Sequence, residues 1–287
     1  MGIYLSRRIN GVDILDKEFK LVSELENYKD KKIKCIGILN LMPNKIETER
    51  HFLKLLEDIN IDVFVKFIRL GTYQSKSISK EYIYENYYLF DEVKYDLDGI
   101  IITGAPVEKL EFKDVKYIDE LNQIVEYSNK NLKNKLYICW AAQAALNHTY
   151  KVRKVINSNK IFGIYSHKII KEDKILEGVY EGFKSPHSRY TTLETVDMSK
   201  CDDVNILSTT YDDYEHIAKG KYNDYYIFGH CEYDKYTLKN EYLRDLKKNH
   251  KIDLPKDYFL ENNPQKEIVN TWIESSIKIY KNWINCI

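Results

Sequence analysis

The 287-residue sequence predicts an α/β fold, with a doubly wound parallel sheet and antiparallel additions. Short apolar runs alternate with amphipathic segments over the first 150 residues, which is the order of strand, helix and strand in parallel sheets. Two of these runs end in turn residues, at Pro43 and at the 104–106 turn. The second half carries short β-type runs separated by glycine and Asn-Asp turns, which favour antiparallel strands.

The first half supplies the predicted parallel strands. We expect them at residues 33–41, 62–70, 97–103 and 136–139. Asn44 and Glu47 form a capping pattern that begins a helix with an apolar stripe through residue 59, and another helix is expected over residues 115–125. Residues 71–89 are rich in Tyr, Ser and Lys, which predicts a loop with a short helix and a candidate lid.

The second half is more β-like. Runs at residues 161–165, 204–210 and 225–228 predict added antiparallel strands. A charged helix is expected at residues 239–251, and a loop and terminal helix follow it. Residues 1–30 are polar and weakly patterned, which predicts an N-terminal arm, and residues 31–287 are expected to form a single domain.

Charge and cysteine content exclude several classes of protein. Lys plus Arg equals Asp plus Glu at 44 each, so a strong nucleic-acid binder is not expected. No apolar run approaches the ~20 residues of a membrane span. The five cysteines are scattered, which indicates neither a disulfide framework nor a zinc knuckle. We therefore expect a cytoplasmic protein with neither membrane nor nucleic acid as a partner. The neutral net charge does not exclude a local basic pocket for a phosphorylated cofactor, but neither a bound metal nor a bound cofactor is expected.

Cys139 lies where a predicted strand meets a predicted helix, since residues 141–146 are a strong helix-forming run. A cysteine on such a turn has the geometry of a nucleophile elbow, and the helix N-terminus favours its thiolate. The alternative is a buried structural cysteine, which is common for free thiols. Because ligands bind beyond the carboxyl ends of parallel strands, where the 104–106 turn would also lie, we predict that Cys139 is a nucleophile.

A thiol nucleophile needs a base, and the base needs an orienting group. His230 and Glu232 are the best candidate pair, because residues two apart share a face if the strand continues past Gly229.

The other histidines are weaker candidates for the base. His51, His148 and His250 are expected at the surface. His167 and His187 stay open, and His187 is expected in a polar loop that meets a ligand.

Six stretches in order make the sequence recognisable. They are LNLMPNKIETE (39–49), DGIIITGAPVE (98–108), CWAAQA (139–144), PHSR (186–189), GHCEYD (229–234) and EYLRD (241–245). On these motifs the chain resembles the homoserine O-acyltransferases of the MetA type over residues 33–250. The resemblance implies a class I glutamine-amidotransferase-like (flavodoxin-like) fold and transfer of an acyl group from acyl-CoA to homoserine in methionine biosynthesis.

The resemblance also implies roles for individual residues. Cys139 would be the acyl-thioester nucleophile, His230 the general base and Glu232 the third active-site residue. The matches to substrate-binding residues are Lys160, Ser188, Arg244 and Lys45. An oxyanion would be held by the backbone N–H of Trp140 with one from the turn at residues 43–45.

The expected acyl donor follows from one position. In the family, the residue after Gly-Ala-Pro-Val is Gly in enzymes that use succinyl-CoA and Glu in enzymes that use acetyl-CoA. In this chain that residue is Glu108. A carboxylate there would repel the free carboxylate of a succinyl group. We therefore expect ping-pong transfer from acetyl-CoA, bound only as a co-substrate, to the hydroxyl of L-homoserine, by a homodimer.

Other interpretations stay open. The acceptor could be another hydroxy amino acid such as serine, or the donor succinyl-CoA. A glutamine amidotransferase-type glutaminase is a second class, because Cys with His-x-Glu on this fold also hydrolyses glutamine, although the elbow here lacks the Gly-x-Cys-x-Gly pattern. A catalytically silent relative is a third, and the intact set of candidate residues argues against it.

Overall fold

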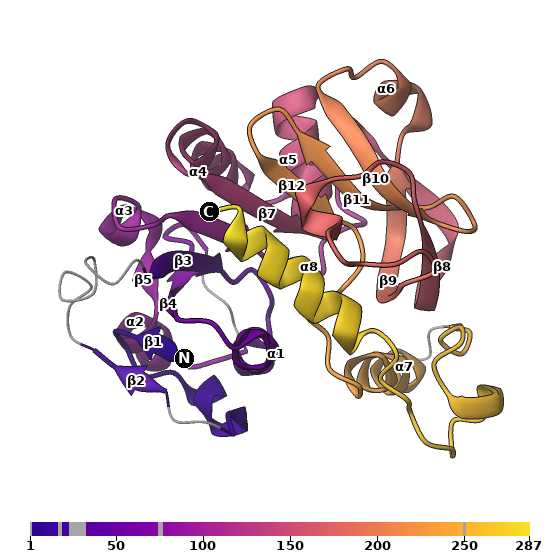
Figure 1. The fold of residues 1–287 in the computed structure, drawn as a ribbon, viewed down its shortest axis with the longest axis horizontal. Coiled ribbons are helices and arrows are strands. Elements are labelled where there is room, and N and C mark those ends of the chain that lie inside the picture. Colours follow the sequence, from indigo (N-terminus) through magenta and orange to yellow (C-terminus); the bar gives the residue numbers. More distant parts are fainter. Residues whose placement is uncertain (1, 17–18, 23–32, 74–76, 249–250) are drawn as a thin grey trace.

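The computed structural model describes residues 2–16, 19–22, 33–73, 77–248 and 251–287. Their strands form one sheet in the order β2-β1-β4-β3-β6-β7-β12-β11-β10-β8-β9, with β5 beside β4. Figure 1 shows this sheet running through the molecule, with helices packed on it. The predicted α/β fold is confirmed.

Parallel strands form the half of the sheet from β2 to β12. They are β1 (Ile3–Leu5), β2 (Lys20–Leu21), β3 (Lys34–Leu39), β4 (Val63–Arg69), β5 (Tyr88–Leu89), β6 (Gly99–Ile102), β7 (Asn134–Ile138) and β12 (Asp224–Ile227). The four strands predicted in the first half are therefore confirmed as β3, β4, β6 and β7. Their carboxyl ends lie at one edge, where ligands bind in such sheets.

The remaining strands are antiparallel. They are β8 (Lys154–Ile169), β9 (Lys184–Leu193), β10 (Val204–Thr210) and β11 (Glu215–Gly220). The expectation that residues 225–228 form an antiparallel addition is only half right. After a tight turn at Asn223, β12 runs antiparallel to β11, and this direction makes it parallel to its other neighbour, β7.

Strand β9 was not predicted, and the reason lies in its side chains. Ser185, His187, Arg189 and Thr191 all point to a buried face of the strand. Polar residues at inward positions break the apolar pattern from which strands are recognised. The stretch at residues 186–189, expected in a polar loop, is therefore a buried part of the sheet.

The predicted N-terminal arm contributes to the sheet edge. Residues 3–5 pair with β4 as β1, and η1 (Asn10–Ile14) rests on the first helix, where the Gly11 N–H donates to Glu49 Oε2 at 3.0 Å. Residues 1, 17–18 and 23–32 of this predicted arm lie outside the described residues.

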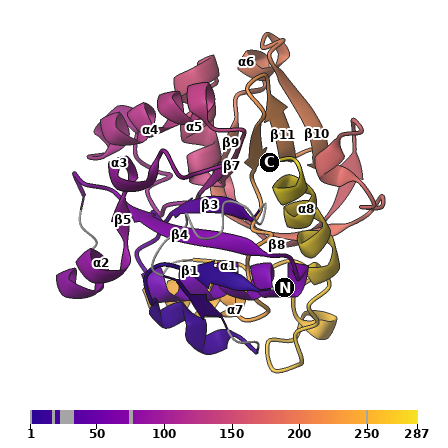
Figure 2. The same cartoon turned by 60° about the vertical axis from the view of Figure 1, so that its left-hand side comes forward.

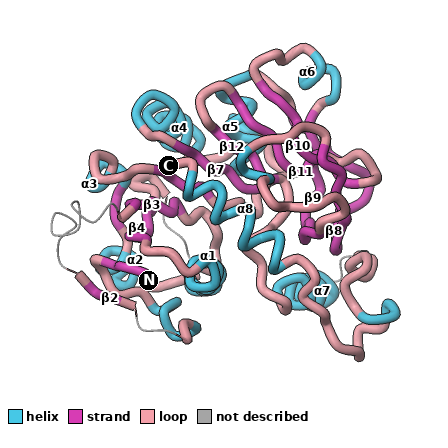
Figure 3. Tube along the Cα trace, in the orientation of Figure 1, coloured by secondary structure: helices cyan, strands magenta, loops and turns pink. Residues whose placement is uncertain are grey.

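Helices cover both faces of the sheet, as Figures 2 and 3 show. Helices α1 (Lys45–Ile59) and α8 (Ile273–Asn285) share one apolar core with Ile36 and Ile38 of β3. Helices α4 (Ile118–Asn131) and α5 (Trp140–Tyr150) pack in a second core with Cys35 and Leu39, which point the other way. The remaining helical segments are α2 (Lys80–Asn86), α3 (Phe90–Val93), η3 (Phe112–Asp114), η4 (Lys174–Leu176), α6 (Thr195–Ser199), α7 (Thr237–Lys247) and η5 (Leu260–Asn262).

Helix α1 begins where the capping pattern predicted, but by a different contact. Asn44 is the N-cap residue, yet its side chain accepts no bond from the helix backbone. Its Nδ2 instead donates to Glu47 Oε2 at 2.5 Å, which ties the two side chains together. Among the described helices, none combines the length and the apolar character needed to cross a membrane.

Candidate active site

Cys139 occupies the sharp turn between β7 and α5. Its backbone has φ of 50° and ψ of −114°, which is strained for a residue with a side chain. Hydrogen bonds hold the turn on both sides, since the Cys139 N–H donates to the Ile227 carbonyl at 2.7 Å and the Cys139 carbonyl accepts from the Gln143 N–H at 3.2 Å. The sequence-predicted elbow therefore exists, and its thiol lines a cavity.

His230 and Glu232 follow β12 on a turn and not on a continued strand. The strand ends at Ile227, and the Tyr233 N–H donates to the His230 carbonyl at 3.1 Å. The turn still joins the two side chains, because His230 Nδ1 lies 2.8 Å from Glu232 Oε1. The His230 ring also stacks on Tyr233, with 4.1 Å between ring centroids. The imidazole is thus held in one orientation from two sides.

Charge around His230 favours its protonated form. Burial alone lowers the pKa of this imidazole, but the Glu232 carboxylate and hydrogen-bonded Cys139 raise that pKa well above its ordinary value. A cationic imidazole beside a cysteine is the environment in which a thiolate is stable. The three residues can therefore supply a charged sulfur nucleophile and a group that returns the proton.

One cavity of about 160 Å³ collects most of the predicted site. The predicted residues that line it are Cys139, His230, Glu108, Lys160, Ser188 and Arg244. A second cavity of about 530 Å³ adjoins it and is lined by Glu232 as well as by His230 and Arg244. Because these side chains come from β8, β9, α7 and three strand-end loops, their meeting depends on the whole sheet.

The wall formed by β8, β9 and α7 carries both signs of charge. Lys160 Nζ lies 3.3 Å from Asp245 Oδ2 and 3.6 Å from Glu241 Oε2. Arg244 Nε donates to Asp245 Oδ1 at 2.9 Å, and the Ser188 hydroxyl donates to Glu241. Paired cations and carboxylates of this kind suit a zwitterionic ligand.

Glu108 reaches the cavity from the loop that follows β6. Its carboxylate accepts the Tyr190 N–H at 3.1 Å. Burial raises the pKa of Glu108, while the Tyr190 N–H and the Lys160 charge oppose that rise. A carboxylate is therefore fixed in the cavity that also holds the thiol.

Lys45 does not line either cavity. It is buried at the start of α1, its Nζ donates to the Asn40 carbonyl, and burial lowers its pKa to about 8. It borders a separate small cavity instead. Its backbone N–H donates to the Pro43 carbonyl at 3.2 Å, so that N–H is not free for the oxyanion role expected of this turn.

Trp140 is the first residue of α5. Its backbone N–H directly follows Cys139 at the helix N-terminus, where N–H groups have no intrahelical partner. Its indole is fully buried in the core formed with α4. Any contribution to an oxyanion hole would therefore come from the backbone.

Glu241 is a candidate that the sequence analysis did not single out. It lines both cavities and accepts the Tyr233 hydroxyl at 2.9 Å as well as that of Ser188. It lies three residues before Arg244, and this spacing puts both on one face of α7. The three-residue spacing between Glu241 and Arg244 is the sequence signal from which Glu241 could have been identified.

Two histidine predictions are wrong. His187 is fully buried in β9, 3.0 Å from His167, and burial lowers its pKa well below the ordinary value. His51 is buried and not at the surface, with Nε2 3.0 Å from Thr237 Oγ1. His250 lies outside the described residues.

Comparison with known proteins agrees with the sequence motifs. A family model described as homoserine O-succinyltransferase matches residues 2–287. The homoserine O-acetyltransferase of Clostridium tetani is 38% identical over 292 residues, which cover 99% of this chain and 95% of that protein. Homoserine O-acetyltransferase 1 of Ilyobacter polytropus is 40% identical over 261 residues, which cover 87% and 84% of the two chains.

Solved structures add evidence on the fold. A glutamine amido transferase from Methylobacillus flagellatus superposes with a TM-score of 0.58 at 12% identity, covering 89% of this chain and 95% of that one. At this low sequence identity, the structural similarity is evidence about the fold alone. It confirms the predicted class I glutamine-amidotransferase-like fold. The family match and the curated relatives confirm the resemblance stated from the motifs. The chain therefore belongs to the homoserine O-succinyltransferase family.

Proposed function

We propose that this protein is a homoserine O-acetyltransferase of methionine biosynthesis, which moves an acetyl group from acetyl-CoA to the hydroxyl of L-homoserine through acetyl-Cys139. The observation that carries the proposal is the strained Cys139 turn beside the His230–Glu232 pair, in one cavity with Glu108 and Arg244. The curated relatives that bear the name homoserine O-acetyltransferase support it over nearly the whole chain.

The donor step forms one thioester and breaks another. The Cys139 thiolate attacks the carbonyl carbon of acetyl-CoA, and the resulting oxyanion accepts the Trp140 N–H and an N–H of the 104–105 turn, whose residues line the cavity. The tetrahedral intermediate collapses, the CoA sulfur leaves, and protonated His230 gives it a proton. Acetyl-Cys139 and neutral His230 remain.

The acceptor step reverses the proton flow. Neutral His230 removes the proton from the homoserine hydroxyl as the oxygen attacks acetyl-Cys139. O-acetylhomoserine leaves, the sulfur departs as thiolate, and His230 is protonated again. Glu232, 2.8 Å from Nδ1, stabilises that positive charge and keeps Nε2 available for the transfer.

The charged wall offers a place for the amino acid. The Arg244 guanidinium, half exposed, could pair with the carboxylate of homoserine. Glu241 could accept its ammonium group, since the Glu241 carboxylate already accepts two hydroxyl donors in the cavity. Both groups lie on α7 and line the cavity that Cys139 also lines, so they would hold the acceptor within that cavity.

A substrate panel tests the proposal. Homoserine, serine and glutamine are each incubated with acetyl-CoA or succinyl-CoA, and CoA release and glutamate formation are measured. We expect CoA release with homoserine and acetyl-CoA. Faster turnover with serine or with succinyl-CoA would reassign the acceptor or the donor, and glutamate formation without CoA release would identify a glutaminase.

A further inference from the structure

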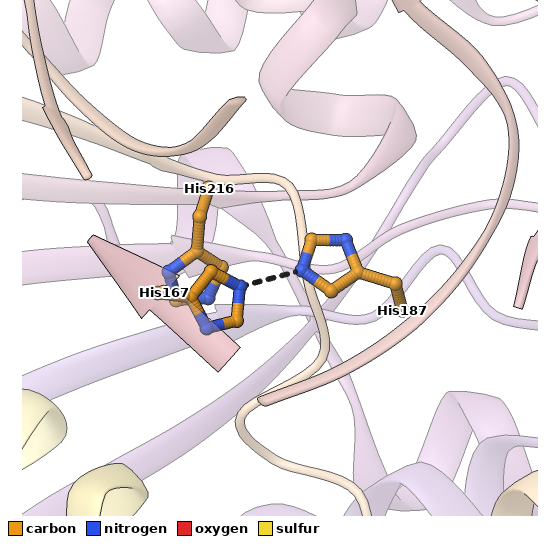
Figure 4. A group of neighbouring side chains, drawn as sticks. All are labelled: His167, His187 and His216. Carbon is orange, nitrogen blue, oxygen red and sulfur yellow. Dashed lines mark hydrogen bonds between the residues drawn. The ribbon is translucent and has the colours of Figure 1, made fainter. Parts of the chain in front are cut away.

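Three buried histidines meet beneath the proposed catalytic turn. His167 comes from β8, His187 from β9 and His216 from β11. Figure 4 shows their rings gathered together, with a hydrogen bond drawn between His167 and His187. All three are fully buried, and one nitrogen of each lies within 4.8 Å of the others. Histidine is the commonest metal-binding side chain, and three imidazoles are a frequent zinc ligand set.

Hydrogen bonds fix which nitrogen of His167 carries its proton. His167 Nδ1 lies 3.1 Å from the Phe183 carbonyl, which can only accept, so Nδ1 is the donor. The Nε2 atom, 3.0 Å from His187 Nε2, therefore presents a lone pair if the ring is neutral. A protein oxygen behind one nitrogen and a lone pair in front of the other is the arrangement of metal-binding histidines.

Both ring nitrogens of His216 have polar neighbours. Its Nδ1 lies 3.2 Å from the Ser208 hydroxyl, and its Nε2 lies 3.9 Å from the Cys231 sulfur. Its ring centroid is 3.8 Å from that of His167. The two rings therefore lie against one another. For both to bind one ion, they have to tilt apart so that the ion lies in the plane of each imidazole ring.

The third histidine leaves an unsatisfied group. Since His167 Nε2 accepts, His187 Nε2 must donate, and His187 Nδ1 then has no hydrogen-bond partner within the described part of the chain. Metal binding would move this proton from Nε2 to Nδ1 and turn both facing nitrogens toward the ion. Their separation of 3.0 Å is close to the ~3.3 Å between ligand nitrogens on one tetrahedral zinc, at ~2.0–2.1 Å per bond.

Two positive charges act on the cluster, Arg189 and protonated His230, and His230 is paired with Glu232. The Arg189 guanidinium is buried beside the cluster, and its Nη1 lies 2.5 Å from Glu215 Oε1. The pair is locally neutral, so the cluster is not barred to a cation by Arg189 alone.

We propose that His167, His187 and His216 bind one divalent transition-metal ion of the zinc class, which joins β8, β9 and β11 under the turn that carries His230. Imidazole nitrogens favour such ions over magnesium or calcium. The turn rests on the cluster, since a Cβ built on Gly229 would lie 3.1 Å from His216 Cδ2. A bound ion would therefore stabilise the turn that carries His230, the proposed base. This role does not depend on which acyl group is transferred.

Metal content and cobalt absorption test the site without any assay of turnover. The protein is produced in zinc- or cobalt-supplemented medium as Cys139→Ala, because the active-site thiol could itself hold a metal. We expect about one ion per chain, measured by inductively coupled plasma mass spectrometry, and the intense visible absorption of low-coordinate cobalt(II).

Variants locate the ion. His216→Phe should lose at least ten-fold in zinc affinity, measured by competition with a chromogenic chelator, whereas His148→Gln, a partly exposed histidine paired with Glu126, should retain it. If His216→Phe does not fold, Ser208→Ala leaves all three ligands in place and should still weaken binding about ten-fold. No bound ion above the buffer blank, or equal retention in every variant, would overturn the proposal. Acetylation of Cys139 in the wild type is scored separately, so failure of one proposal leaves the other standing.

Discussion

Replacing Glu108 tests the proposal that its carboxylate selects the acyl donor. Glu108 and Cys139 line the same cavity of about 160 Å³, so a succinyl group on Cys139 would bring its free carboxylate close to the Glu108 carboxylate. At ~5 Å and an effective dielectric constant of ~20, two like charges repel by about 3 kcal/mol. Because each 1.36 kcal/mol is tenfold in rate, we expect ~10²-fold discrimination against succinyl-CoA from this charge.

Two substitutions separate charge from volume. Glu108→Gln removes the charge and keeps an oxygen that can accept the Tyr190 N–H, whereas Glu108→Gly removes charge and side chain together. The ratio of kcat/KM for succinyl-CoA over acetyl-CoA should rise ~10²-fold in the glutamine variant and further in the glycine variant. The exposed Glu111, replaced by Gln, is the matched control and should leave this ratio unchanged.

Acylation of Cys139, followed by intact mass without an acceptor, isolates the donor step. The selectivity should also depend on pH, because burial raises the pKa of Glu108. As the pH falls, Glu108 takes up a proton before an exposed glutamate would, and the rejection of succinyl-CoA should weaken. A donor ratio unchanged in both Glu108 variants would refute the electrostatic and the steric argument together.

Three further predictions concern the proposed nucleophile, the proposed base and the fold. Acetyl-CoA alone should add one acetyl group to the wild type and none to Cys139→Ala by intact mass, and an unmodified wild type would rule out the covalent route. Glu232→Gln should lower the pKa of His230, so the alkaline limit of the acetylation rate should move to lower pH; an unmoved limit would show that Glu232 does not act through the imidazole. Gly163→Ala should cost about 2–4 kcal/mol in urea unfolding, because its Cβ would lie 2.2 Å from a neighbouring backbone nitrogen. Gly178→Ala, where only a φ of 71° opposes a side chain, should cost ~1 kcal/mol, and equal losses would contradict the steric explanation.

Much of the parallel half of the sheet could be predicted from local sequence. Strands β3, β4, β6 and β7 are buried on both faces, so each is a continuous apolar run in the sequence. The helices between them can be recognised from the helical spacing of their apolar residues. The elbow at Cys139 was found for the same reason, because a strand, one cysteine and a helix are adjacent in the chain.

The antiparallel half was harder because its polar side chains are satisfied by distant partners. His187 and Arg189 on β9 are buried against His167 of β8 and Glu215 of β11, and no local pattern shows those contacts. The same limit explains Glu241, whose partners Ser188 and Lys160 lie on other strands.

The sequence by itself determined the fold class, the Cys139 elbow, the pairing of His230 with Glu232 and the family, because each rests on neighbouring residues or on ordered motifs. Only the tertiary structure decided that Lys45 lies outside the cavity, that Glu241 lines it, and that three histidines from three strands meet beside Gly229. These features depend on how strands far apart in the chain pair and on what each buried polar group finds as its partner. Such contacts are fixed by the packed sheet as a whole.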